Sequence, residues 1–217
     1  MTAFAKAPDL PTFVPERHYS IAEWLAIEEA SGERYEYHDG FLVSVRAMAG
    51  GTFRHALLIG NVTHALGDAV RREEEAIPAY CNVLSSDLRL GVVPSGRYYY
   101  PDVAVVCGRP RFDEIVPTAV VNPVCVCEVL SPSSEGFDSG EKFDRYAELE
   151  TLRDYVLVSQ NRRRVEVRSR ASVSDPWRYK VFTGTEAEIR LDGLGYSLPF
   201  AGVYRGWAEA DPEAQSA

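Results

Sequence analysis

The sequence has no long apolar run. None of its apolar stretches reaches the ~18 residues that a membrane-spanning helix needs, although 46% of its 217 residues are hydrophobic. The first 20 residues contain a single lysine and no continuous apolar core, which argues against a secretory signal. We therefore expect a cytoplasmic protein without membrane contact, and its charged fraction of 25% is typical of a globular chain.

Basic residues are also in short supply. The chain has 23 Lys and Arg against 32 Asp and Glu, a net charge of −9. Proteins that coat nucleic acid without specificity usually carry a basic excess, so any contact with nucleic acid must be local here. The candidate stretch is Arg162-Arg163-Arg164. The same three arginines could equally be the solvated tip of a hairpin.

Metal-binding cysteine patterns are missing as well. The four cysteines, Cys81, Cys107, Cys125 and Cys127, form no CxxC pair and have no His/Cys spacing for zinc. They lie in apolar or strand-like stretches, so we expect all four to be reduced thiols in the core. The sequence also contains no Gly-rich phosphate loop and no internal repeat.

The chain reads as one domain with short ends, because a chain of this length can bury a single sizeable core. We expect a flexible arm at 1–18, a single domain at 19–206 and an acidic tail at 207–217. Periodicity and capping signals predict helices at 20–30, 50–72 and 138–152. Strands are predicted at 34–37, 41–45, 80–90, 98–106, 120–130, 154–159, 164–168, 177–182 and 188–191. The fold class is α/β (α+β), with a central mixed sheet flanked by helices.

Two carboxylates break the apolar pattern of the predicted strands. Asp102 opens the run Val103 to Val106, and Glu128 lies inside the run Val124 to Leu130. Burying an unpaired carboxylate costs several kcal/mol, so each acid needs compensation. If the strands are neighbours, the two acids converge at one end of the sheet, and hard oxygen ligands suit Mg²⁺ or Mn²⁺. Alternatively, each acid pairs separately with an arginine, or Asp102 is a turn residue at the strand entry.

Lys142 is predicted in the first turn of a helix, where its charge opposes the macrodipole. Asp138, Lys142 and Tyr146 lie near one face of that helix, which could fold back onto the end of the Glu128 strand. A solvated surface lysine is the alternative. Asp87 is a further strand acid that either faces the site or pairs with Arg89.

An ordered set of motifs carries a family resemblance. Tyr100-Pro101-Asp102-Val103, Glu128-Val129-Leu130-Ser131-Pro132-Ser133 and Lys142-Phe143-Asp144-Arg145-Tyr146 resemble the Uma-type "putative restriction endonuclease" family. That family is a branch of the PD-(D/E)XK nuclease superfamily. The upstream Tyr35-Glu36-Tyr37-His38-Asp39-Gly40 and His55 also match its pattern, and the resemblance covers about Ser20 to Phe200.

The resemblance implies a restriction-endonuclease-like fold and a metal-dependent nuclease, with DNA as the expected partner. Asp102 and Glu128 look like the metal-binding acids, and the carbonyl of Val129 would be a further ligand for Mg²⁺ or Mn²⁺. Lys142 would orient the attacking water or stabilise charge on the phosphate. Glu36 resembles the additional acid of the family. His55 could touch a phosphate or be satisfied at its own helix end.

One position departs from the superfamily pattern. The lysine usually stands two residues after the second acid, where this chain has Leu130; relatives in this branch supply it from the following helix, as Lys142 would. A nuclease-fold module without turnover, which binds DNA or self-associates, is the alternative, and a hydrolase of small phosphate esters ranks third. A homodimer that cuts two strands is expected by analogy with the superfamily.

Overall fold

The structure is a computed structural model that describes residues 14, 16–45, 52–73, 80–131, 135–184 and 186–210. Its helices are α1 (Ile21–Ser31), α3 (Phe53–Glu73), α4 (Glu135–Ser139), α5 (Glu141–Tyr146) and α6 (Phe200–Val203), with a 3-10 turn η1 (Val93–Ser95). Its strands are β1 (Tyr35–His38), β2 (Phe41–Ser44), β3 (Cys81–Ser85), β4 (Leu90–Val92), β5 (Arg97–Tyr99), β6 (Val103–Cys107), β7 (Cys125–Leu130), β8 (Asp154–Ser159), β9 (Val165–Ser169), β10 (Arg178–Phe182), β11 (Glu188–Leu191) and β12 (Tyr196–Pro199). No helix in these ranges is long and apolar enough to cross a membrane.

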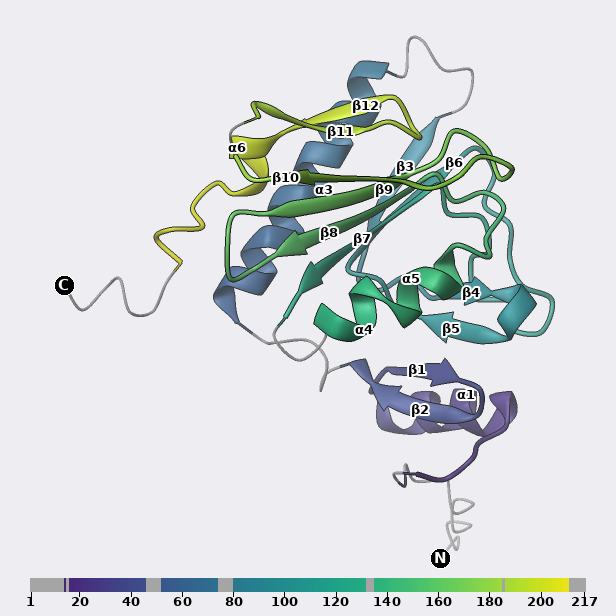
Figure 1. The fold of residues 1–217 in the computed structure, drawn as a ribbon. Coiled ribbons are helices and arrows are strands. Elements are labelled where there is room, and N and C mark those ends of the chain that lie inside the picture. Colours follow the sequence, from purple (N-terminus) through teal and green to yellow (C-terminus); the bar gives the residue numbers. More distant parts are fainter. Residues whose placement is uncertain are drawn as a thin grey trace, which may run out of the picture.

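A six-stranded mixed sheet forms the centre of the molecule, in the order β10-β9-β8-β7-β6-β3. Strands β7 and β8 are parallel, and the other neighbours are antiparallel. The long helix α3 crosses one face of this sheet, while α4 and α5 lie on the other (Figure 1). The predicted mixed sheet flanked by helices is confirmed.

Successive residues of the central strands pack into two separate hydrophobic cores, one on each face of the sheet. Val103, Val105 and Cys127 pack toward α3, whereas Ala104 and Val126 pack toward Tyr146 of α5. The period of two that places neighbours on opposite faces explains the division. Glu128 has the parity of Val126, so its carboxylate emerges on the side of α5.

A second sheet, β2-β1-β5-β4, lies beyond α4 and α5 and packs against α1 (Figure 1). Helix α1 begins at a capping box in which Ser20 and Glu23 satisfy each other's backbone N–H groups, as the sequence predicts. The β1–β2 hairpin turns at Asp39 and Gly40, both with positive φ. Gly40 also has to be small, because a Cβ there would lie 2.4 Å from Nδ1 of His18.

Three predicted elements are each divided in the structure. The helix expected at 138–152 is two short helices that meet at Gly140, a residue with a non-helical backbone, and the second ends at Tyr146. The strand expected at 98–106 is interrupted at Pro101, which cannot donate to a ladder; β5 joins the small sheet and β6 the large one. The strand expected at 80–90 breaks at a turn after Ser85.

The expectation of four reduced cysteines is wrong for one pair. Cys81 and Cys107 face each other across the antiparallel β3–β6 ladder, with Cα atoms 4.0 Å apart, and form a disulfide. Cys125 and Cys127 are free and buried, as predicted. The register that brings Cys81 opposite Cys107 is a property of strand pairing, which composition and spacing do not determine.

The predicted ends of the chain lie largely outside the described residues, which begin at Val14 and end at Ala210. The backbone N–H of Tyr19, the first residue of the predicted domain, donates to the carbonyl of Gly40 in the small sheet. Trp207, where the acidic tail was expected to begin, packs against the main core and donates from Nε1 to the carbonyl of Gln160 at 2.9 Å.

Candidate active site

The two strand acids meet where β6 and β7 pair. Val103 stands opposite Cys127 in this antiparallel ladder, so Asp102 and Glu128 occupy the next position along. The N–H of Asp102 donates to Oε2 of Glu128 at 3.3 Å, and the N–H of Val129 donates to Oδ2 of Asp102 at 2.7 Å. Each carboxylate is therefore held by the backbone of the other strand, and the predicted convergence is confirmed.

Burial shapes the titration of both carboxyl groups. Burial raises the pKa of Asp102, and the nearby charge of Asp138 adds to the increase. Burial raises the pKa of Glu128 well above its usual range, with contributions from the surrounding carboxylates. Acids that repel each other in a poorly hydrated site favour a cation between them. This pair therefore has the electrostatics of a cation site.

Lys142 reaches the same place from α5. It is only 4% exposed, and its Nζ lies 2.9 Å from Oε1 of Glu128, 3.2 Å from Oε1 of Glu36 and 3.5 Å from Oδ1 of Asp138. Burial alone would lower the pKa of Lys142, but the charges of Glu128 and Glu36 raise it well above its usual value. The lysine is a protonated, buried member of the site, and the alternative of a solvated surface lysine is wrong.

Glu36 enters the site from β1 and is fully buried. It accepts a hydrogen bond from the N–H of Tyr100 at 3.2 Å, and its Oε2 lies 3.0 Å from Nε2 of His38. Burial would raise the pKa of Glu36, but Lys142 and His38 lower it on balance. An ionised Glu36 therefore holds the ammonium group of Lys142 together with Glu128.

His55 approaches from α3, on the opposite face of the sheet. Its Nε2 lies 3.0 Å from the carbonyl oxygen of Val129 and 3.6 Å from Oδ2 of Asp102. Because a carbonyl only accepts, this nitrogen carries the proton and donates it. The other helical histidine, His64, is exposed and pairs with Asp68. The structure thus places His55 in the site and leaves His64 outside it.

Asp138 is a member of the site that the sequence placed on the helix face of Lys142 and Tyr146 but not among the predicted site residues. It lies in α4 and is buried, and its carboxylate faces Lys142 across the break at Gly140. The i, i+4 spacing to Lys142 was the available signal. Tyr146 is also buried beside the site, and among the described residues its hydroxyl has no hydrogen-bond partner.

The remaining residues predicted for catalysis or nucleic-acid binding lie outside this cluster of acids and lysine. Asp87 is 79% exposed, forms an ion pair with Arg34 and does not face the site. The predicted pairing of Asp87 with Arg89 is also wrong, because Arg89 binds Glu28 and the hydroxyl of Tyr100. Arg162, Arg163 and Arg164 occupy the β8–β9 turn, as the hairpin prediction required; Arg164 forms an ion pair with Glu166 at 2.7 Å.

The site provides an oxygen donor set that suits a hard divalent cation. Asp102 and Glu128 are adjacent, and Oε1 of Glu128 lies 2.9 Å from the ammonium nitrogen of Lys142. The carbonyl of Val129 has a second lone pair beside the one that His55 uses. Among the described residues no three His, Cys, Asp or Glu side chains cluster as a metal site by themselves. The carbonyl of Val129 and solvent would therefore complete the coordination of Mg²⁺ or Mn²⁺.

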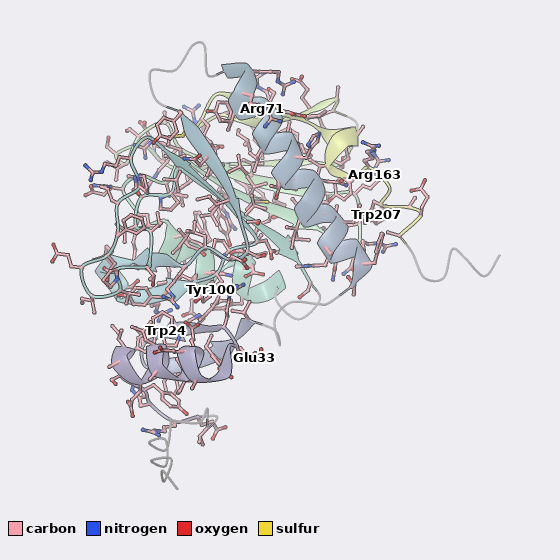
Figure 2. The ribbon with its side chains drawn as sticks, turned by 180° about the vertical axis from the view of Figure 1, so that it is seen from behind. Trp24, Glu33, Arg71, Tyr100, Arg163 and Trp207 are labelled. Carbon is pink, nitrogen blue, oxygen red and sulfur yellow. A yellow bond between two sulfur atoms is a disulfide. The ribbon has the colours of Figure 1, made fainter. Side chains whose placement is uncertain are left out.

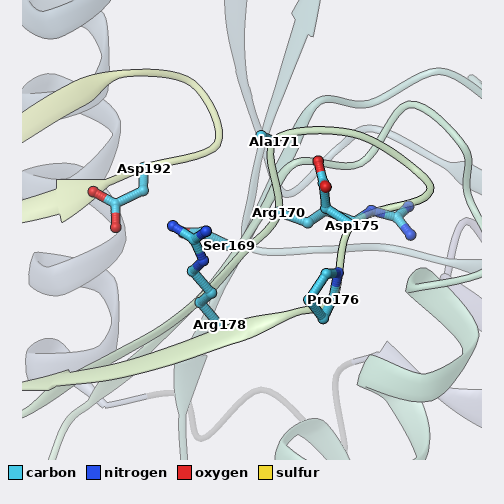
Figure 3. A pocket seen from close by; sticks show the side chains of 7 residues that line it. All are labelled: Ser169, Arg170, Ala171, Asp175, Pro176, Arg178 and Asp192. Atoms are coloured by element: carbon cyan, nitrogen blue, oxygen red, sulfur yellow. The ribbon is translucent and has the colours of Figure 1, made fainter.

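A separate hollow lies at the other end of the central sheet. Arg178 of β10 and Asp192 of the β11–β12 turn extend toward one another across it (Figure 3). Asp192 already forms an ion pair with Lys180. The hollow contains none of the predicted site residues, so the clustered acids and lysine remain the candidate active site.

Comparison with known proteins gives a family match over most of the chain. The sequence model of Uma2, described as "Putative restriction endonuclease", matches residues 21–201. Two Synechocystis proteins are similar over most of their length. One, "Uncharacterized protein sll1609", is 33% identical over 79% of this chain and 92% of its own. The other, "Uncharacterized protein slr1290", is 30% identical over 96% of this chain and 100% of its own.

The fold also has a counterpart among solved structures. A crystal structure from Anabaena variabilis, described as a putative nuclease belonging to DUF820, superposes with a TM-score of 0.61. The match covers 82% of this chain and 92% of that one, at 14% sequence identity. At that identity the likeness establishes a shared fold and leaves the chemistry to be argued from the residues.

Proposed function

This chain belongs to the Uma2 family, and from that membership together with the site geometry we propose that it is a metal-dependent nuclease that hydrolyses phosphodiester bonds of DNA. One observation carries the proposal. A buried lysine from α5 lies beside two carboxylates that emerge side by side from β6 and β7. A buried cluster of charges of this kind is costly to the stability of a folded protein, so its presence favours a functional role.

Asp102, Glu128 and the carbonyl of Val129 would hold Mg²⁺ or Mn²⁺. When bound, the cation polarises a phosphate oxygen and lowers the pKa of a water molecule. His55 fixes the direction of the Val129 carbonyl through its 3.0 Å hydrogen bond, and the Val129 N–H fixes Asp102. These contacts orient the donors before any ligand arrives, which reduces the reorganisation that binding requires.

Lys142 provides the positive charge of the proposed reaction. Its pKa is raised, so it stays protonated and cannot serve as a general base at neutral pH. An ammonium group can donate to the attacking water or to a phosphate oxygen, where negative charge grows in the transition state. Glu36 and Asp138 hold the lysine in position from β1 and α4. The separation of 14 positions between Glu128 and Lys142 is acceptable, because the chemistry requires a cationic group near the phosphate and not a fixed sequence offset.

The alternative is a module that keeps the fold without turnover. The specific observation in its favour is the 2.9 Å contact between Nζ of Lys142 and Oε1 of Glu128. A lysine in that place can neutralise the acids and so take over the electrostatic task of a cation. Turnover and metal binding separate the two possibilities, since such a module has neither.

The test is metal binding and cleavage by the wild type, Asp102→Asn and Glu128→Gln. Metal at 100 times its Kd should stabilise the wild type by about 2.7 kcal/mol, and both amide variants should lose that increase. Plasmid or single-stranded DNA should be cut by the wild type with Mg²⁺ or Mn²⁺ and not by the variants. An RNA substrate and free nucleotides run in parallel define the substrate class. A wild type that neither binds metal nor cuts would replace this proposal with the module.

Cutting both strands of a duplex would require two active sites or a second encounter. We include a homodimer in the proposal for this reason, by analogy with related nucleases. Sedimentation of the protein with and without a duplex oligonucleotide checks it.

A further inference from the structure

Tyr146 of α5 carries a hydroxyl group that the proposed reaction does not use. The residue is fully buried, and among the described residues its hydroxyl forms no hydrogen bond. A buried hydroxyl without a partner lowers the stability of the folded state, because water satisfies the same group in the unfolded chain. Phenylalanine would fill the space without that cost, so packing alone does not explain a tyrosine at this position.

Two further aromatic rings surround the ring of Tyr146. Its centroid lies 5.1 Å from that of Tyr99 and 5.8 Å from that of Tyr155. The cluster lies where the small sheet meets the central one, and Figure 2 labels Tyr100, the neighbour of Tyr99, in this region. The hydroxyl of Tyr155 donates to the carbonyl of Asp138 at 2.9 Å. A hydroxyl in this cluster can therefore find a partner, which sets Tyr146 apart.

Tyr146 also lies close to the charged cluster of the candidate active site. Lys142 and Tyr146 stand four positions apart in α5, so their side chains share one face of the helix. Nζ of Lys142 lies 5.7 Å from the centroid of the Tyr99 ring that Tyr146 packs against. Burial and the charge of Glu128 raise the pKa of Tyr146, and Lys142 lowers it. The phenol thus interacts electrostatically with both members of the Lys142–Glu128 pair.

The contact between Lys142 and Glu128 conflicts with the binding of a metal. Nζ of Lys142 lies nearest to Oε1 of Glu128, at 2.9 Å, and farther from Glu36 and Asp138. Under the proposed function Glu128 also binds Mg²⁺ or Mn²⁺, and two cations repel each other on one carboxylate. Lys142 then has to leave Oε1, and one of its three N–H groups loses its acceptor. A buried charged donor without an acceptor is costly.

We propose that the hydroxyl of Tyr146 takes the place of this acceptor and receives a hydrogen bond from Lys142 when Glu128 binds a divalent cation. The inference rests on the proposed function and makes Tyr146 a positioning residue of that site. A phenolic oxygen can accept a hydrogen bond and carries no charge. It can therefore hold the ammonium group beside Glu36 without adding another carboxylate to the cluster.

The first experiment compares Tyr146→Phe, which removes only the hydroxyl, with Tyr98→Phe as the matched control. Tyr98 is a buried tyrosine of β5 that packs toward α1, and its hydroxyl donates to Asp113 at 3.1 Å. Without metal, the urea midpoint of Tyr146→Phe should equal or exceed that of the wild type, whereas that of Tyr98→Phe should be lower. In titration calorimetry, Tyr146→Phe should raise the Kd of Mg²⁺ and Mn²⁺ about fivefold, and Tyr98→Phe should not change it.

A second measurement follows the lysine directly. The chain contains three lysines, Lys6, Lys142 and Lys180, so NMR of protein labelled with ¹³C at Cε of lysine is simple to assign. Lys6→Arg and Lys180→Arg identify two of the signals and leave the third to Lys142. The Lys142 signal of the wild type should shift with Mg²⁺. At saturating Mg²⁺ it should differ between the wild type and Tyr146→Phe, and an identical signal in the two proteins would overturn the proposal.

The outcomes separate this role from the nuclease proposal. If Tyr146→Phe keeps the wild-type Kd, or is less stable than the wild type without metal, the inference is wrong, whether or not DNA is cut. If Tyr146→Phe weakens metal binding as expected but the wild type cuts no DNA, the role of Tyr146 stands and the nuclease fails. If the wild type binds neither Mg²⁺ nor Mn²⁺, the role of Tyr146 is overturned, and cleavage alone decides the nuclease.

Discussion

Glu128 and Asp154 are both buried carboxylates on neighbouring parallel strands, and their surroundings differ in kind (Figure 1). Asp154, at the start of β8, accepts from the hydroxyl of Ser169 and from the N–H groups of Gly193 and Leu194. Neutral donors satisfy it within the fold. Glu128 instead lies beside three more acids, Asp102, Glu36 and Asp138, and the lysine Lys142.

The contrast shows how a structural carboxylate can be told from a candidate functional one. A carboxylate that joins elements needs only donors, and Asp154 thereby connects β8, β9 and the β11–β12 turn. A site for chemistry collects charges of both signs, as the carboxylates and the lysine around Glu128 do. Burial alone raises the pKa in both places and does not distinguish them.

Among the variants of the Glu128 site, replacing Lys142 by methionine should have the largest effect on stability. The change leaves Glu36 and Glu128 buried without their shared cation, so the free energy of unfolding should fall by about 3 to 5 kcal/mol. Urea denaturation measures it. Adding Glu36→Gln should recover part of the loss, and full stability in the single variant would show that the acids are compensated elsewhere.

Glu128→Gln should have the next largest effect, and on turnover more than on stability. Under the proposed function Glu128 is a metal ligand, and its loss should remove several kcal/mol of transition-state stabilisation, which corresponds to a decrease in rate on the order of 100-fold or more. Single-turnover cleavage with excess enzyme measures this rate. Asp154→Asn, matched in chemistry and burial, should keep its turnover once folded, and equal losses in both variants would remove the distinction.

The pH dependence of the free energy of unfolding should show how the structural carboxylate Asp154 titrates. Burial raises the pKa of Asp154 to about 6, above that of an unfolded aspartate. Between these two values the folded state holds more protons, so the contribution of Asp154 to stability falls as the pH rises from about 4 to above 6. The decrease is on the order of 3 kcal/mol.

Denaturation of the wild type and Asp154→Asn across pH 4 to 8 isolates that contribution. The difference in the free energy of unfolding between the two proteins should change with pH in this window and level off above it. A constant difference would mean that Asp154 titrates alike in both states.

Ser169→Ala should have the smallest effect. The hydroxyl donates to Oδ1 of Asp154, and its removal should cost about 1 to 2 kcal/mol. It should also raise the pKa of Asp154 further, because that hydrogen bond lowers it. NMR titration of the carboxyl carbon checks the shift, and cleavage should be unchanged.

Local pattern predicted the parts of the site that depend on single strands. Asp102 after Pro101 and Glu128 within an apolar run stand out because strands seldom carry acids. Their convergence then required only that β6 and β7 be neighbours. The position of Lys142 in the first turn of a predicted helix singled it out, and the likeness of the motifs added Glu36. The contact between these two residues is contained in no local pattern, because their elements lie far apart in the sequence.

Most features that the sequence did not predict depend on contacts between strands that are distant in the sequence. Asp154 resembles any polar residue at the start of a strand, and its three donors come from β9 and the β11–β12 turn. The break at Gly140 was hidden because Asp138 and Glu141 have the spacing of a helix start. The disulfide and the separate small sheet both follow from strand partners that only the folded chain selects.

The Cys81–Cys107 bond has a consequence for the unfolded chain. Twenty-six residues of sequence separate the two cysteines, and β4, β5 and Asp102 all lie between them. By the chain-entropy argument, a covalent ring of this size lowers the conformational entropy of the denatured ensemble and so raises its free energy by roughly 3 to 4 kcal/mol at 25 °C. When oxidised, the chain therefore searches for the β3–β6 pairing inside a small ring, and Asp102 of the candidate active site already lies within that ring.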